Sequence, residues 1–222
     1  MSRPEIVTRN VVLFPSITVS QMAVATSAKL AEQFGSSIRL DPVNSAIPHI
    51  TLHQFAIPAD NLASLEERVA KIARETYTLD VVMTTCGQWG DGGIWWDTGH
   101  GETDLWRLHS KLVPRIVELQ DSYLLPHLTG MLTGEIPCSP KEREAFLRYG
   151  SPFANPKLPD LPFRPHITVG KVHQQATASA IQAANEHVKN GVRFNVKSIH
   201  ITELGPHGTC PASLKAFGLQ ST

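Results

Sequence analysis

The sequence has no excess of either charge, few cysteines and no long apolar run. Twenty Lys and Arg balance twenty Asp and Glu over 222 residues, so no overall field would draw the protein onto duplex DNA or an anionic membrane. No apolar run approaches the roughly 18 residues of a membrane span, and no signal-peptide core follows residues 1–10. We therefore expect a cytoplasmic protein that binds neither duplex DNA nor a membrane.

Metal and cofactor signatures are also missing. The three cysteines, Cys86, Cys138 and Cys210, are far apart and form no CxxC pair, which argues against a disulfide framework and a zinc knuckle. The sequence contains no HExxH motif, no cluster of carboxylates and no GxxxxGK[ST] loop. We predict free thiols, no metal site and no cofactor.

The hydrophobic pattern predicts alternating strands and helices. With 41% hydrophobic and 18% charged residues, the chain can bury a substantial core. The segments predicted as strands are 6–14, 49–57, 77–85, 94–96, 166–172, 192–203 and 214–219, with a hairpin turn at 87–93. The segments predicted as helices are 18–34, one after Pro58, one near 102–116, 140–149 and 177–190. Thr18 and Gln21 would form a capping box for the first helix, and Pro114 should kink or shorten the third. Residues from about 120 to 161 are rich in proline and are predicted to form a surface insertion.

One short motif occurs twice. Pro48-His49-Ile50-Thr51-Leu52 returns as Pro165-His166-Ile167-Thr168-Val169. Side chains alternate along a strand, so the His and Thr of each copy should face one side and the aliphatic residues should face the core. The repeat predicts an α+β fold of two pseudo-symmetric lobes, each an antiparallel β-sheet backed by helices, with an active cleft between them.

Two histidines and two threonines suit the hydrolysis of a phosphodiester. Without a metal, hydrolysis needs a base that takes a proton from water and an acid that protonates the leaving alkoxide. Histidine titrates where both forms coexist near neutrality. We predict His49 and His166 as the acid and the base, in either order. Thr51 and Thr168 would donate hydrogen bonds to the phosphate oxygens and hold the phosphorus in line.

On these motifs the sequence resembles the two-histidine (2H) phosphoesterases, whose hallmark is two H-x-[ST]-x motifs, present here as His49-Ile50-Thr51-Leu52 and His166-Ile167-Thr168-Val169. The family includes cyclic nucleotide phosphodiesterases and the bacterial proteins called 2′-5′ RNA ligases. The resemblance covers most of the chain, including a closing turn at 203–208, and implies one bilobal 2H domain over residues 1–222 with an insertion at about 120–161. It implies a monomer that hydrolyses a cyclic phosphate or nucleotide phosphodiester, such as a 2′,3′-cyclic nucleotide or a 2′-5′ linkage, without a metal.

A third H-x-T sequence, Pro126-His127-Leu128-Thr129, competes with the second copy of the motif. Gly130 and Pro137 follow it closely, and such residues cannot sustain a long central strand. His166 is instead followed by a predicted strand, a helix and two further strands. We therefore assign the second catalytic role to His166 and interpret His127 as a solvated loop residue.

Further candidate substrate contacts are His53, Trp95, Arg164, Lys171 and His207. His53 should share the strand face of His49, although a histidine hydrogen-bonded at the strand end explains it equally well. The four tryptophans, Trp89, Trp95, Trp96 and Trp106, could stack on a base or belong to the core. Arg164 and Lys171 flank the second motif and could bind phosphate or be ordinary surface charges. His207 lies in a glycine-rich turn that could close over the site or simply be exposed.

Other functions stay open. Reversal of hydrolysis would join RNA termini through a 2′-5′ linkage, although the neutral net charge speaks mildly against a groove for long strands. A non-catalytic binder of nucleotides or phosphorylated metabolites would keep affinity without turnover. Residues 143–153, ahead of 163–166, look similar to 2H members encoded with phosphonate metabolism, which adds a role in that metabolism to the candidates.

Overall fold

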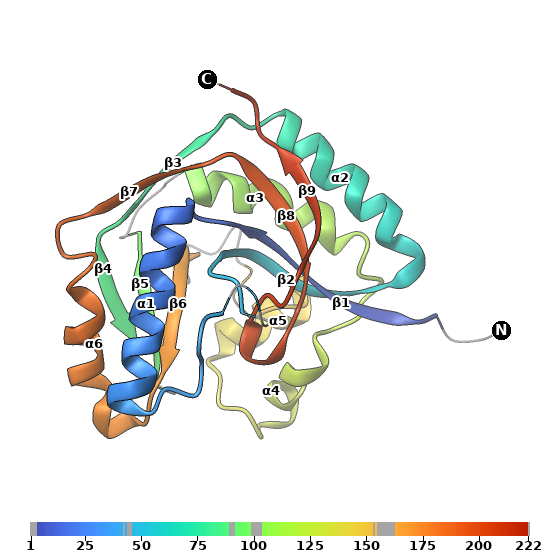
Figure 1. Cartoon of the computed structure of the whole chain (residues 1–222). Helices are drawn as coiled ribbons and strands as arrows, with labels where there is room; N and C mark the ends of the chain where they lie inside the picture. The colour runs from blue at the N-terminus through green and yellow to red at the C-terminus, as the bar shows by residue number, and fades with distance from the viewer. Residues whose placement is uncertain are drawn as a thin grey trace.

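The computed structural model describes residues 4–41, 43, 46–88, 92–98, 104–152, 154 and 163–221 (Figure 1). The strands are β1 (Ile6–Leu13), β2 (Ile50–Pro58), β3 (Leu79–Met83), β4 (Thr85–Gln88), β5 (Gly93–Asp97), β6 (His166–Lys171), β7 (Val192–Val196), β8 (Ser198–Glu203) and β9 (Ser213–Gly218). The α-helices are α1 (Ile17–Phe34), α2 (Leu62–Arg74), α3 (Asp104–Val117), α4 (Gly130–Thr133), α5 (Pro140–Tyr149) and α6 (Thr177–Asn185). Short 3-10 turns are η1 (Ala59–Asn61), η2 (Pro126–Leu128), η3 (Gln174–Ala176) and η4 (Pro206–Gly208).

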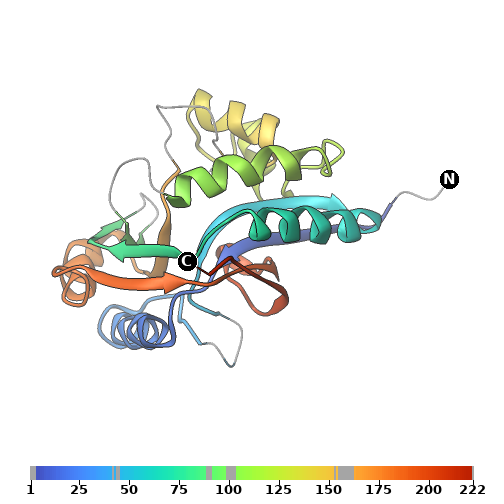
Figure 2. The same ribbon diagram turned by 90° about the horizontal axis from the view of Figure 1, so that it is seen from above.

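The paired strands form antiparallel sheets backed by helices. The first sheet has the order β2-β1-β8-β9, the second has the order β4-β5-β6, and β3 pairs with β7. Helices α2 and α3 lie against the first sheet, whereas α1 and α6 pack on the second (Figures 1 and 2). The predicted α+β class, with antiparallel sheets backed by helices, is confirmed.

The two halves of the sequence are interleaved in space. Strands β8 and β9, which follow the second motif, join β1 and β2 in the first sheet. Helix α1, which precedes the first motif, packs on β6 of the second sheet. One continuous core runs through both sheets and includes Leu13, Ile50, Trp96, Ile167 and Ile199. Neither half of the sequence could therefore bury its apolar face without the other.

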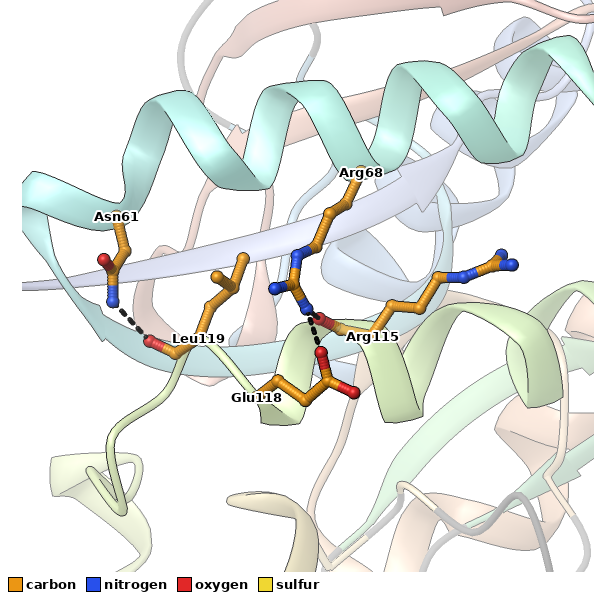
Figure 3. Close-up of polar contacts among 5 residues, drawn as sticks. All are labelled: Asn61, Arg68, Arg115, Glu118 and Leu119. Carbon is orange, nitrogen blue, oxygen red and sulfur yellow. Dashed lines mark hydrogen bonds and ion pairs between the residues drawn. The ribbon is translucent and has the colours of Figure 1, made fainter.

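Side chains of α2 and of the turn before it tie the end of α3 in place (Figure 3). Asn61 Nδ2 donates to the carbonyl of Leu119 at 2.8 Å, and Arg68 Nη1 donates to the carbonyl of Arg115 at 2.5 Å. The same guanidinium nitrogen lies 2.6 Å from Glu118 Oε2. The last carbonyls of a helix have no partner within it, so these side chains supply the missing donors. They hold the two helices that cover the first sheet at a fixed separation.

The helix boundaries confirm some local predictions and correct others. Helix α5 begins with a capping box of Ser139 and Glu142 and ends at Gly150, with a φ of 71°, matching the predicted helix 140–149. Helix α1 ends before Gly35, which has a φ of 65°, and its N-cap is Ser16, whose hydroxyl accepts from Val19 N at 3.4 Å. The predicted capping box at Thr18 is therefore wrong, because the helix has already begun at Ile17.

Three longer segments also differ from prediction. Helix α3 continues past Pro114, which lies on its exposed face, so the proline does not shorten the helix. The predicted strand 192–203 divides at Lys197, because β7 pairs with β3 whereas β8 pairs with β1. Helix α6 ends at Asn185, and the chain reaches β7 through turns.

The described part of the 120–161 insertion has a small core of its own. Leu125 and Met131 pack against Phe146 of α5. Tyr149, also on α5, packs against Val113 of α3. The insertion is thus a helical layer over the outer side of α3, as Figure 2 shows for α5. Among the described residues, no helix is long and apolar enough to cross a membrane.

Candidate active site

The two repeated motifs lie on neighbouring strands. His49 immediately precedes β2, His166 is the first residue of β6, and these two strands contact each other across the sheets. Both imidazoles are half-buried, and the charge of His49 acts on His166. The structure therefore brings together the two histidines that the repeat singled out.

Each imidazole is anchored in the same way. His49 Nδ1 lies 2.7 Å from the carbonyl oxygen of Ile47, and His166 Nδ1 lies 2.7 Å from that of Arg164. A carbonyl only accepts, so Nδ1 carries the hydrogen and Nε2 is the nitrogen that gains or loses a proton. The prolines at positions 48 and 165 contribute, because a residue before proline is held in an extended conformation and its carbonyl is thereby fixed.

A β-bulge follows each motif threonine. In β2, Thr51 pairs with Val12 and His53 pairs with Val11, so Leu52 is the extra residue. In β6, Thr168 pairs with Trp95 and Gly170 pairs with Ile94, so Val169 is the extra residue. A bulge moves the following side chain to the opposite face of the strand. The pseudo-symmetry of the motifs therefore extends to their backbone.

The first bulge removes His53 from the cleft face. Its cross-strand partner Val11 belongs to the core, and His53 itself is 2% exposed. It packs on Phe55 with ring centroids 5.2 Å apart and interacts with His109, which is 1% exposed and bonds the carbonyl of Leu52 at 2.7 Å. Alternation without a bulge predicted His53 beside His49, and the structure places it inside the core.

The surroundings of His49 favour its protonated form. Burial opposes a charge on this imidazole, but the electrostatic effect of the Cys210 side chain, together with the backbone of Ile47 and Gly208, outweighs burial and raises its pKa. Cys210 itself is fully buried in the segment between β8 and β9. No sequence pattern connected Cys210 with His49.

The surroundings of His166 favour its neutral form. Burial lowers its pKa, and the charges of His49 and Arg164 act in the same direction, against the opposing effects of the Arg164 carbonyl and Asp97. Asp97 is 4% exposed and lies directly across from His166 on β5. The ring of Trp95 lies 5.8 Å from that of His166, centroid to centroid. Sequence reasoning missed Asp97, which a prediction of strand register could have found.

A small hollow, open to solvent, lies beside His49. Its lining includes Thr168 and the turn of His207, Gly208 and Thr209. His207 is exposed and has a φ of 56°, a conformation that is rare outside glycine. The turn that sequence placed near the site therefore does border this hollow.

The other candidate residues lie at different depths. Thr51 is half-buried on β2, and Arg164 is exposed directly before the second motif. Trp95 is 5% exposed and lies against Gly87, where a Cβ would come within 2.2 Å of its ring. Lys171 is at the opposite end of β6 from His166. Trp89 falls outside the described residues.

The third H-x-T sequence is not part of a strand. Pro126 to Leu128 form the 3-10 turn η2, and His127 is exposed. The preference for His166 over His127 agrees with this geometry. In the part of the chain that the structure describes, no group of three or more His, Cys, Asp or Glu side chains could hold a metal ion.

Comparison with known proteins identifies the fold. No family model and no curated protein matches the sequence. E. coli LigT complexed with 3′-AMP has a TM-score of 0.56 at 12% sequence identity, with 97% of this chain and 99% of LigT covered. TT0787 of Thermus thermophilus also scores 0.56, at 16% identity over 96% and 98% of the two chains. A structure described as a phosphoesterase scores 0.52 at 12% identity over 96% and 98%. The chain thus has the fold of these proteins over nearly its whole length.

Proposed function

We propose that the chain is a 2H phosphoesterase that hydrolyses a cyclic phosphate or nucleotide phosphodiester without a metal, using His49 and His166. One observation carries the proposal. Two histidines on contacting strands are both anchored through Nδ1 to the carbonyl two residues earlier, so both have Nε2 as the reactive nitrogen. The shared fold with LigT, which has been solved with 3′-AMP and with phosphate, supports a nucleotide phosphate as ligand.

The pKa directions support one division of the two roles. The pKa of His166 is lowered, so the neutral imidazole is favoured and can act as the base that takes a proton from the attacking water. The pKa of His49 is raised, so its Nε2 holds the proton that the leaving alkoxide needs. Water oxygen bonds to phosphorus, the P–O bond to the leaving group breaks, and the proton that left water ends on His166. In the reverse direction His49 would act as the base and His166 as the acid, and the same site would join two RNA termini.

Threonine hydroxyls complete the proposed site. Thr168 borders the hollow beside His49, and Thr51 occupies the matching position on β2 before its bulge. Hydroxyl donors aimed at the non-bridging oxygens would offset the charge that develops on them. The exposed guanidinium of Arg164 is available to phosphate at the mouth of the site.

The test is hydrolysis of a panel of 2′,3′-cyclic nucleotides, 2′-5′ dinucleotides and simple cyclic phosphates in the presence of EDTA. We expect turnover that resists EDTA and falls by about 10²- to 10⁴-fold in His166→Ala. His127→Ala is the matched control, because it removes a histidine from the same H-x-T pattern at an exposed 3-10 turn. It should leave turnover unchanged.

Three results would count against hydrolysis by this pair. If His127→Ala and His166→Ala lost turnover equally, the assignment of His166 as the second catalytic histidine would be contradicted. No turnover on any substrate, with nucleotide binding still measurable by calorimetry, would favour the non-catalytic binder. Formation of 2′-5′ linkages from the product ends, without measurable cleavage, would favour end joining.

A further inference from the structure

One buried histidine of α3 contacts the first motif and the segment that leads into the second. His109 is 1% exposed, and α3 packs on β2. Its Nδ1 lies 2.7 Å from the carbonyl oxygen of Leu52, in the first motif. Its ring stacks on that of Phe163, shortly before His166, with centroids 4.1 Å apart and an interplanar angle of 3°. A single imidazole therefore links two segments that are far apart in sequence.

The bond to Leu52 stabilises the first bulge. Leu52 is the extra residue of β2, so it is not matched to a residue of β1. It is 1% exposed, and a buried carbonyl without a donor is costly. A carbonyl only accepts, so His109 carries its hydrogen on Nδ1 and supplies a donor to this carbonyl. The bond thus holds the backbone directly after Thr51, which an apolar side chain of similar size could not do.

The stack on Phe163 acts on the second motif through the backbone. Phe163 is half-buried and is followed by Arg164, whose carbonyl oxygen lies 2.7 Å from His166 Nδ1. Contact between two aromatic rings stabilises beyond the area that they bury, so the stack restrains the start of the segment that anchors His166. Helix α3 is itself tied to α2 at its C-terminal end. His109 is therefore fixed on a helix that is held in place independently of either motif.

We propose that His109 is a positioning residue that holds both motifs in place with one imidazole, the first through a hydrogen bond and the second through a ring stack. Its effect on turnover rests on the proposed hydrolysis, but its effect on the two motifs does not. His109 is buried, so it contacts no substrate and acts only by fixing Thr51 and His166. Burial also lowers its pKa to about 4, so the ring stays neutral near neutrality. Small displacements of groups at a reacting centre have large effects on kcat.

Two substitutions separate the two contacts. Backbone amide NMR signals of the full chain report on the first motif (residues 51–53) and on the second (residues 164–168) without any substrate. His109→Phe keeps a ring for the stack but has no donor, so the first-motif signals should move and the second-motif signals should stay. His109→Asn keeps a donor but has no ring, so the second-motif signals should move instead. Phe163→Leu, at a half-buried position, should fold and reproduce the pattern of His109→Asn.

Kinetics on the same variants separates positioning from simple packing. In each of the three variants kcat should fall by about 10- to 100-fold with a smaller change in KM. Val113→Ala is the matched control, because Val113 lies on the same helix but packs against Tyr149 of α5. It should lower the thermal transition and leave both sets of signals and kcat unchanged.

Two results would overturn the proposal. One is that the signals of both motifs move together, or not at all, in every variant that folds. The other is a wild-type kcat in those variants, which would make His109 an ordinary core residue. If no substrate is turned over by the wild type, the proposed hydrolysis fails, but the NMR pattern still decides whether His109 positions the two motifs.

Discussion

The two motif strands share one backbone design and differ in what surrounds their histidines. Each has an imidazole bound to the carbonyl two residues earlier and a bulge after its threonine. Around His49 lie a buried thiol and the turn between β8 and β9, whereas around His166 lie Trp95 and Asp97 of β5. The comparison teaches that the repeated motif fixes Nδ1 of both histidines in the same way, while unrepeated neighbours shift the two pKa values in opposite directions.

The largest expected effect comes from removing either histidine. His49→Asn and His166→Asn should each lower kcat by about 10²- to 10⁴-fold, as expected for loss of a general acid or base. Their pH profiles should differ. The pKa of His166 is lowered below 6.5, so its loss should remove the acid limb, and the pKa of His49 is raised above 6.5, so its loss should remove the alkaline limb. The residual rate of each variant, measured from the acid to the alkaline limb, would show which limb it lacks. Loss of the same limb in both variants would contradict the proposed difference between the two histidines.

The second prediction contrasts the cleft histidines with the buried pair. Burial lowers the pKa of His53 to about 3 and that of His109 to about 4, from an ordinary 6.5. As pH falls below 6.5 the unfolded chain binds protons that the folded core refuses, so stability is lost from pH 6.5 down toward 4. At about pH 5 the loss is about 2 kcal/mol for each histidine.

The measurement for the buried pair is urea unfolding from about pH 4 to about pH 8, which spans the titration of an ordinary histidine. His53→Phe should flatten the acid slope, because an apolar ring at that position does not titrate. His127→Phe is the control, since His127 is exposed. The same acid slope in wild type and His53→Phe would mean that this pair does not set acid stability.

The third prediction tests the packing behind His166. A Cβ at Gly87 would meet the ring of Trp95 at 2.2 Å, so Gly87→Ala should displace the indole that lies against His166. We expect a loss of about 1 to 3 kcal/mol in unfolding free energy, as for other overpacked sites. Gly218→Ala is the matched control, because a Cβ there meets nothing within 4 Å. Thermal unfolding and kcat of both variants measure the effect, and equal stabilities would refute it.

The smallest expected effect is a difference in kcat/KM between substitutions of the two motif threonines. Thr168 borders the hollow beside His49, whereas Thr51 does not belong to its lining. Thr168→Val should therefore lower kcat/KM more than Thr51→Val, by about tenfold for the loss of one hydrogen bond to a charged group. Steady-state kinetics on the best substrate of the panel would measure both. A larger loss in Thr51→Val would reverse the predicted order.

Sequence predicted the parts of the fold that depend on local patterns. The motif strands, the amphipathic helices and the helix 140–149 that became α5 all follow from periodicity and turn chemistry within a few residues. The sequence analysis placed His53 wrongly, because one extra residue in β2 reverses the side-chain alternation. No local sequence pattern predicts this bulge. Asp97 and Cys210 were missed for another reason, since each reaches its histidine only through contacts between segments that are distant in sequence.

The order of strands in the first sheet also has a consequence for biosynthesis. Strand β1 pairs with β8, and Thr202 bonds the carbonyl of Asn10 across 192 positions of sequence. At ribosomal speeds of about 5 to 20 residues per second, one edge of β1 therefore waits roughly 10 to 40 seconds for its partner. Its apolar Val11, Val12 and Leu13 make such an edge prone to aggregate. The first sheet therefore cannot be completed until β8 emerges from the ribosome.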